Sequence, residues 1–214
     1  MPAQLDYRTI DAIFDRFHAA EPEPRGELDH TNAYTLLVAV ALSAQATDKG
    51  VNRATRALFA EVDTPAKMLE LGEERLIEHI RTIGLYRNKA KNVIALSRIL
   101  VEHYGGEVPS SRAALQSLPG VGRKTANVVL NMWWRLPAQA VDTHIFRVAN
   151  RTGLAPGRDV VAVERALEDQ IPARFQHHAH HWLILHGRYV CTARKPACRA
   201  CLIRDLCDYE EKTL

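Results

Sequence analysis

Apolar residues recur at helical spacing along almost the whole chain, and no stretch bounded by turn residues shows the strict alternation of a half-buried strand. This pattern predicts an all-α fold. With 214 residues, 47% of them hydrophobic, the chain is long enough for one large domain or two small ones with their own cores. Residues 34–43 are apolar on every side, which indicates a fully buried helix.

Capping residues set the expected ends of the helices. Asp48 and Thr64 are each expected to cap a helix, and Asp142 or Thr143 a third. Gly105 is expected to end the longest helix. The expected helices cover 10–17, 34–43, 49–60, 73–81, 88–104, 112–118, 123–134, 143–153, 160–170 and 176–190, together with a helix that begins at Pro65.

The charged residues are unevenly distributed, although the formal net charge is only +3. Residues 1–80 carry 8 basic and 14 acidic side chains, whereas residues 81–135 carry 9 basic and 2 acidic ones. A basic block beside an acidic one is typical of a surface that binds a polyanion, but a solvated helical face would give the same count. The basic block consists of Arg81, Arg87, Lys89, Lys91, Arg98, Arg112, Arg123, Lys124 and Arg135.

No segment has the character of a membrane span or of an export signal. The longest strictly apolar run, 36–42, has seven residues, whereas a span needs about 20. The N-terminus lacks a basic segment followed by an apolar one. We therefore expect a soluble protein that does not bind membranes and stays in the cytoplasm.

All four cysteines lie close together near the C-terminus, in the spacing Cys191-x6-Cys198-x2-Cys201-x5-Cys207. In a reducing compartment such clustering indicates a metal centre rather than two disulfides. Zinc and an iron–sulfur cluster both suit four thiolates. The single Cys-x2-Cys pair in one continuous string favours the iron–sulfur cluster over zinc.

Basic residues lie within the cysteine segment, and a run of histidines precedes it. Arg194 and Lys195 are among the basic residues interleaved with the cysteines, so this loop is a candidate second contact to phosphate. The run at 177–181 contains four histidines, but helical spacing sends them to different faces. Surface or hydrogen-bonded core positions are therefore favoured for these histidines over metal binding.

Pro119-Gly120-Val121-Gly122 is expected to form a hairpin between two helices. Its two glycines let the backbone turn tightly and expose N–H groups beside a helix N-terminus, which makes an anion site out of backbone. Such a site binds sugar-phosphate without reading sequence, although an ordinary helix–helix turn has the same composition.

A lysine and an aspartate follow this hairpin. Lys124 stands in the first turn of the next helix, and Asp142 stands 18 residues further on. Taken alone, they are as well explained as a solvated lysine and a helix cap. Position alone therefore favours the solvated lysine and the helix cap over a catalytic role.

Several segments, taken with the cysteine spacing, closely resemble the endonuclease III family of DNA repair enzymes. The resemblance runs in order from about residue 28 to Cys207. It implies bifunctional DNA glycosylase and abasic-site lyase activity on duplex DNA. The segments are LSAQATD at 42–48, TIGLYRNKA at 82–90, LPGVGRKTANVVLN at 118–131, VDTHIFRVANRTG at 141–153 and HHWLILHGRYVC at 180–191.

The resemblance also implies a domain organisation. A six-helix barrel domain with the helix-hairpin-helix at about 112–134 would comprise residues 26–136. A second helical domain, formed by 1–25 and 137–214, would hold a [4Fe-4S] cluster on the four cysteines. A cleft would separate the two domains, and we expect a monomer.

The resemblance further implies site residues and a substrate class. Lys124 would attack the deoxyribose C1′ and form a Schiff base, assisted by Asp142. Gln45 would fill the space left by a flipped nucleotide, and Leu85 would wedge beside the orphaned base. His144 would order the phosphate-facing side of its helix. The substrates would be oxidised, ring-saturated or fragmented pyrimidines and abasic sites in duplex DNA.

Two alternatives remain at this point. The related adenine glycosylase that acts opposite oxidised guanine shares the cysteine spacing, but that branch generally lacks a lysine at the hairpin and carries a further C-terminal domain. A noncatalytic, metal-stabilised DNA-binding module would need the hairpin and the basic block only. The presence of Lys124 together with Asp142 argues against both alternatives.

Overall fold

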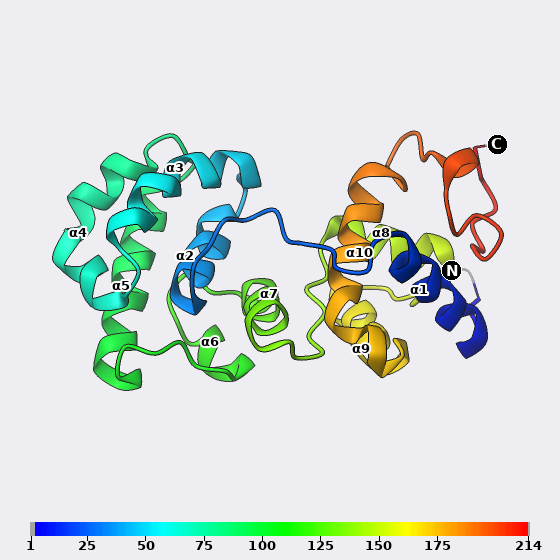
Figure 1. The fold of residues 1–214 in the computed structure, drawn as a ribbon, viewed down its shortest axis with the longest axis horizontal. Coiled ribbons are helices and arrows are strands. Elements are labelled where there is room, and N and C mark those ends of the chain that lie inside the picture. Colours follow the sequence, from blue (N-terminus) through cyan, green and yellow to red (C-terminus); the bar gives the residue numbers. More distant parts are fainter. Residues whose placement is uncertain (1–2, 214) are drawn as a thin grey trace. The chain divides into compact units, whose positions relative to one another are not determined.

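The computed structural model describes residues 3–213, and this part of the chain is helical throughout, without strands (Figure 1). The predicted all-α fold is confirmed. The chain divides into two compact units. Unit 1 contains the described residues of 1–26 and 135–214, and unit 2 contains residues 27–134. No helix in the described residues combines the length and the apolar character that a membrane crossing requires.

Unit 2 is built around a helix whose central residues are all buried. This helix, α2, packs against α3, α5 and α7, while α4 packs against α5. Its residues 34–42 are buried without a polar face, as the sequence predicts. The helices of unit 2 are α2 (Ala33–Ser43), α3 (Asp48–Glu61), α4 (Pro65–Ile80), α5 (Tyr86–Tyr104), α6 (Arg112–Gln116) and α7 (Arg123–Trp134).

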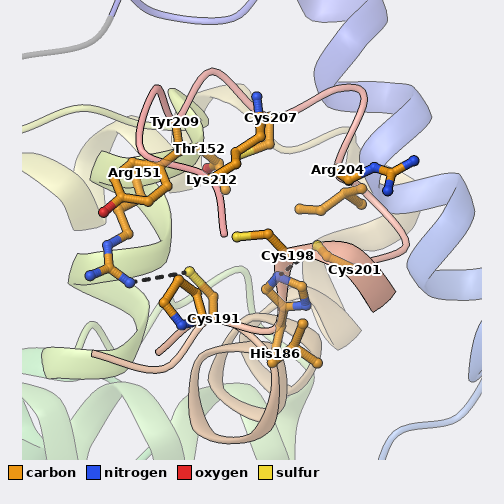
Figure 2. A pocket seen from close by; sticks show the side chains of 13 residues that line it. Arg151, Thr152, His186, Cys191, Cys198, Cys201, Arg204, Cys207, Tyr209 and Lys212 are labelled. Carbon is orange, nitrogen blue, oxygen red and sulfur yellow. Dashed lines mark hydrogen bonds between the residues drawn. The ribbon is translucent and has the colours of Figure 1, made fainter. Parts of the chain in front are cut away.

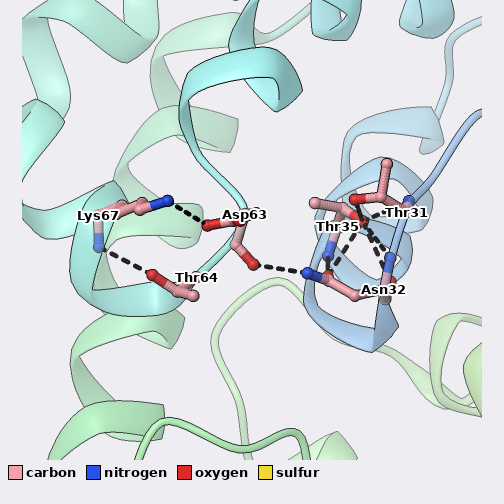
Figure 3. Close-up of polar contacts among 6 residues, drawn as sticks. All are labelled: Thr31, Asn32, Thr35, Asp63, Thr64 and Lys67. Carbon is pink, nitrogen blue, oxygen red and sulfur yellow. Dashed lines mark hydrogen bonds and ion pairs between the residues drawn. The ribbon is translucent and has the colours of Figure 1, made fainter.

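Polar side chains fix the starts of α2 and α4 to each other (Figure 3). Asn32 caps α2 by accepting from the Thr35 N–H at 2.8 Å, and the Thr35 hydroxyl accepts from the Asn32 N–H in return. The Asn32 side chain also donates to the Asp63 carbonyl at 2.7 Å. Asp63 directly precedes Thr64, which caps α4 as predicted. The hydrogen bond from Asn32 to the Asp63 carbonyl therefore links the starts of the two helices.

The start of α3 and the middle of α4 differ from the helices that the sequence predicts. The cap of α3 is Thr47, whose hydroxyl accepts from the Gly50 N–H at 3.1 Å, and not Asp48. That prediction was wrong because Thr47 has the extended backbone of a cap, whereas Asp48 is already helical. Within α4, Gly72 has a φ of 81° and kinks the helix, where the sequence predicted that a separate helix would begin at 73.

Unit 1 joins the first helix of the chain to its C-terminal third. Ile10, Ile13, Phe14 and Phe17 form the buried face of α1. The two phenylalanine rings pack with those of Phe175 and Trp182, at centroid distances of 5.9–6.4 Å. The elements of unit 1 are α1 (Tyr7–Ala20), α8 (Thr143–Thr152), α9 (Val160–Gln170), η1 (Ala173–Phe175), α10 (Gln176–Tyr189) and η2 (Cys198–Ala200).

The histidine run lies in the first half of α10. His180 and His181 are buried, whereas His177 and His178 are partly exposed. Among residues 3–213, no group of three or more histidine, cysteine, aspartate or glutamate side chains converges on a site for a metal ion. Burial, with smaller contributions from His177 and His178, lowers the pKa of His181 from 6.5 to about 4.

We expect His181 to make folding stability depend on pH. Its pKa is lower in the folded state, so the unfolded state binds the extra proton and acid favours unfolding. The contribution is complete above pH 6.5 and is lost as the pH falls toward 4. Between pH 7 and pH 5 it amounts to about 2 kcal/mol.

Urea unfolding of His181→Gln should therefore show a weaker loss of stability between pH 7 and pH 5 than the unsubstituted chain. His103→Gln, which changes an exposed histidine on α5, is the matched control and should keep the original pH dependence. Equal pH dependence in all three proteins would contradict the burial of a neutral His181.

Candidate nucleic-acid interface and cysteine pocket

The hairpin between α6 and α7 requires glycine at its second position. Gly120 has a φ of 77°, which L side chains rarely adopt. A Cβ atom on Gly120 would also lie 3.0 Å from Cβ and Nδ2 of Asn92, a residue of α5. The turn is closed by the Val121 N–H, which donates to the Leu118 carbonyl at 3.1 Å. The hairpin therefore sits directly against α5.

Gly122 has a different environment. Its carbonyl accepts the first hydrogen bond of α7, from the Ala126 N–H at 2.9 Å. A Cβ atom on Gly122 would meet nothing within 4 Å, and the residue is exposed. Packing within the protein does not require glycine here. The open space lies over the N-terminus of α7, where backbone N–H groups favour an anion.

Lys124 is exposed in the first turn of α7. The opposite face of this helix is buried, and it includes Ala126, Asn127 and Val129. Arg112 of α6 donates from Nε to Asn127 Oδ1 at 2.7 Å, so a hydrogen bond joins the two helices that flank the hairpin. The fold thus places Lys124 at the surface on a helix with a fixed buried face.

Gln45 and Leu85 are both exposed, and both have left-handed backbone, with φ values of 56° and 60°. Non-glycine residues seldom adopt this conformation, and it is concentrated at functional sites. The two segments are neighbours, because a Cβ atom on Gly84 would lie 4.0 Å from the Gln45 carbonyl oxygen. Leu85 directly precedes α5 and is 63% exposed.

Asp142 is the cap of α8 in unit 1. Its Oδ1 atom accepts from the N–H groups of His144 and Ile145, each at 2.9 Å. Of the two candidate caps for this helix, Asp142 is therefore the one used. His144 Nδ1 lies 3.3 Å from Nη2 of Arg147, and that arginine also donates to the Gly187 carbonyl at 2.7 Å.

The candidate residues are divided between the two units. Gln45, Leu85, the hairpin glycines and Lys124 belong to unit 2, where α5 connects them. Asp142, His144 and the cysteine segment belong to unit 1.

The four cysteines line one pocket, and all of them are free thiols (Figure 2). Four thiols in a common pocket have the donor chemistry of a thiolate-ligated centre, although their side chains do not converge on a single point in this structure. Burial raises the pKa of the Cys201 and Cys207 thiols, and the other cysteines add to this effect. His186 Nε2 lies 3.7 Å from Cys201 Sγ at the edge of the pocket.

Arginines from distant helices hold the cysteine loop in place. Arg16 of α1 donates to the Leu202 carbonyl and pairs with both carboxylate oxygens of Asp205, at 2.5 and 2.7 Å. Arg151 of α8 donates to the carbonyls of Thr192 and Ala193, and its Nη1 lies 3.8 Å from Cys191 Sγ. The sequence interpretation missed both arginines, because no local pattern marks a contact across so many residues.

Arg194 and Lys195 are exposed on the loop between the first two cysteines. The Lys195 carbonyl accepts from the Thr192 hydroxyl at 2.7 Å, which closes a tight turn around these residues. Their charged groups are thus presented to solvent by a loop with a defined backbone.

Comparison with known proteins agrees with these features. A family model described as "HhH-GPD superfamily base excision DNA repair protein" matches residues 38–173. Endonuclease III of Treponema pallidum (strain Nichols) is 59% identical over 203 residues, covering 95% of this chain and 96% of that protein. Endonuclease III of Escherichia coli (strain K12) is 57% identical over 200 residues, covering 94% and 95%.

A solved structure described as a trapped endonuclease III–DNA covalent intermediate, in an estranged-adenine complex, has a TM-score of 0.86 with this chain. Its sequence is 44% identical, and the match covers 95% of this chain and 96% of that one. This chain therefore belongs to the HhH-GPD superfamily of base excision DNA repair proteins and, within it, to the endonuclease III family.

The two hairpin glycines should respond differently to substitution by alanine. Gly120→Ala should destabilise the fold by about 1–3 kcal/mol, because it forces an unfavourable φ and a contact with Asn92. Gly122→Ala should leave the free energy of unfolding within about 1 kcal/mol of the original, yet it should weaken binding to undamaged duplex DNA. Urea unfolding and fluorescence anisotropy measure the two effects. Unchanged DNA affinity in a folded Gly122→Ala variant would show that the hairpin is not a phosphate contact.

Proposed function

We propose that this chain is a base excision repair enzyme that removes oxidised pyrimidines from duplex DNA and cleaves the resulting abasic site. The observation that carries the proposal is an exposed lysine, Lys124, in the first turn of the helix that follows a glycine hairpin. A surface amine beside a backbone anion site can approach a sugar in DNA while the phosphates are held. Membership of the endonuclease III family favours this activity over that of the related adenine glycosylase.

In the proposed reaction, the amine of Lys124 attacks C1′ of the flipped nucleotide. The C1′–N bond breaks as the C1′–Nζ bond forms, and the damaged base leaves with a proton. The sugar ring then opens to a Schiff base. Loss of a proton from C2′ expels the 3′ phosphate by β-elimination, and water releases the lysine. The structural relative described as a covalent intermediate with DNA supports this route.

Asp142 assists Lys124 in this proposal. A carboxylate stabilises cationic character that develops at the sugar, and it can take a proton from the Lys124 ammonium so that the neutral amine attacks. Its Oδ1 atom is occupied by two backbone N–H donors of α8, which hold the carboxylate in one orientation. His144, the second residue of the same helix, orders the phosphate-facing side of α8.

Gln45 and Leu85 recognise the lesion site in this proposal. Gln45 fills the space that the flipped nucleotide leaves, and Leu85 wedges beside the base that has lost its partner. Their exposure and left-handed backbone support these roles, because strained surface residues persist only where the surrounding structure holds them.

The two units correspond in this proposal to the two domains of the family. Unit 2 is the helix-hairpin-helix domain, expected at 26–136. Unit 1, expected at 1–25 and 137–214, holds a [4Fe-4S] cluster on the four cysteines. A free thiol on each cysteine and their common pocket support this assignment. When bound, the cluster stabilises the loop that presents Arg194 and Lys195 to phosphate.

The partner of the enzyme is duplex DNA that contains damaged pyrimidines or abasic sites. We propose that it acts as a monomer in the cytoplasm, on the nucleoid if the source is bacterial. The bacterial sources of its relatives support this location.

Borohydride trapping tests the role of Lys124. The unsubstituted chain should form a stable covalent adduct with duplex DNA that contains thymine glycol or an abasic site, because borohydride reduces the Schiff base. Lys124→Gln should give no adduct and no strand cleavage while still binding the lesion. Asp142→Asn should lower base excision at least about 100-fold and retain slow trapping on abasic DNA. Undiminished trapping by Lys124→Gln would assign the nucleophile to another amine.

Metal analysis tests the cysteine pocket. Protein purified without oxygen should contain about four iron and four sulfide per chain. Cys198→Ser should lose the cluster together with affinity for undamaged duplex, since ligation and local folding are coupled. One zinc per chain and no iron would contradict the cluster, and full DNA affinity in a cluster-free variant would remove Arg194 and Lys195 from the interface.

A further inference from the structure

Helix α5 buries a lysine amine that has no hydrogen-bond partner among residues 3–213. Lys89 is only 7% exposed, and its Nζ atom is fully covered. Burial alone lowers the pKa of this amine, with no contribution from a neighbouring charge. Buried amines are normally paired, because an unsatisfied polar group destabilises the folded state. The isolated protein therefore does not explain why this amine is buried, and a molecule that binds to the protein can.

Lys89 lies on α5 between two residues already placed at the candidate interface. Lys89 and Asn92 are spaced i and i+3, so they share one face of the helix, and Leu85 directly precedes the helix. The Lys89 N–H also donates to the Leu85 carbonyl at 3.0 Å. On one side of Lys89, Leu85 lies beside the Gln45 segment, and on the other side Asn92 touches Gly120. The buried amine thus lies between the segment that probes for lesions and the hairpin.

The segments that build this face are poor in acidic residues, and Asp48 at the start of α3 is the first acidic residue after Gln45. Residues 31–47, 79–101 and 108–134 contain no aspartate or glutamate. The acidic side chains Glu61 and Asp63 of unit 2 pair instead with Arg75, His79 and Lys67. An internal counter-charge for Lys89 is therefore missing from the sequence around it. The anion that would approach this face is the phosphate backbone of bound DNA.

We propose that Lys89 is a positioning residue whose buried ammonium draws the phosphates beside the lesion onto the face formed by Gln45 and Leu85. The inference rests on the proposed function, which brings a duplex to this face. A charge under a low-dielectric surface is screened less by salt than one in solvent. Lys89 therefore acts on the bound duplex through its charge. Burial of its amine makes the free protein less stable.

Lys89→Met tests this role, because methionine keeps the length of the side chain and removes the amine. Lys91→Met is the matched control, since it removes one charge from the exposed side of the same helix. Affinities for a duplex with a tetrahydrofuran abasic analogue and for the undamaged duplex are measured by fluorescence anisotropy at low and high salt. Thermal melting is recorded for each protein.

Lys89→Met should melt at an equal or higher temperature and bind the lesion duplex about tenfold more weakly at both salt concentrations. Its affinity for undamaged duplex should change by less than about twofold. Lys91→Met should weaken binding to both duplexes together, and only at low salt. Lys89→Gln, a polar and uncharged second variant, should lose lesion affinity in the same way.

Original lesion affinity in Lys89→Met would overturn the inference. A clear fall in its melting temperature would do so too, because it would reveal an internal partner for the amine. If the unsubstituted chain shows no preference for the lesion duplex, the proposed function fails, and the role of Lys89 fails with it. A preference that survives in Lys89→Met removes the role of Lys89 alone.

Discussion

The contact between Gly120 and Asn92 sets the geometry of unit 2. With a φ of 77° and Asn92 against it, the hairpin has no room for a side chain at this point and must rest on α5. The same helix begins at Leu85, beside the Gln45 segment. Helix α5 therefore relates the hairpin to Gln45 and Leu85 and, through α7, to Lys124. A shift of this contact would move all of these residues relative to one another.

The distribution of acidic and basic residues in unit 2 complements this geometry. Residues 31–47, 79–101 and 108–134, which carry Gln45, Leu85 and the hairpin, lack acidic residues, while basic residues accumulate between 81 and 135. A surface of this kind attracts phosphate without selecting a base sequence. In the proposed function, selectivity comes from distortion of the duplex at the lesion, where Gln45 and Leu85 would contact it. In unit 1, Arg16 and Arg151 give the cysteine loop the support that its short length cannot provide.

Much of this organisation follows from the sequence. Helical periodicity predicts the buried α2 and the amphipathic α1, and Gly105 marks the end of α5 because glycine alone adopts its left-handed backbone easily. The sequence predicts Asp48 as the cap of α3, but the neighbouring Thr47 can also cap a helix. The sequence alone does not show which of the two residues caps the helix. The left-handed backbone of Gln45 and Leu85 and the contacts of Arg16 depend on tertiary packing. Local patterns therefore carry no signal for them.

The central claim is that the exposed amine of Lys124, held by the hairpin, is the group that bonds to DNA. The chain offers an instructive competitor in Lys89, a buried amine whose pKa is lowered by burial. Peptide mapping by mass spectrometry of the borohydride-reduced adduct, formed by the unsubstituted protein on abasic duplex, locates the bond directly. We predict that the deoxyribose remnant lies on the peptide that contains Lys124. Its presence on the peptide that contains Lys89, or on the N-terminal amine, would contradict the account.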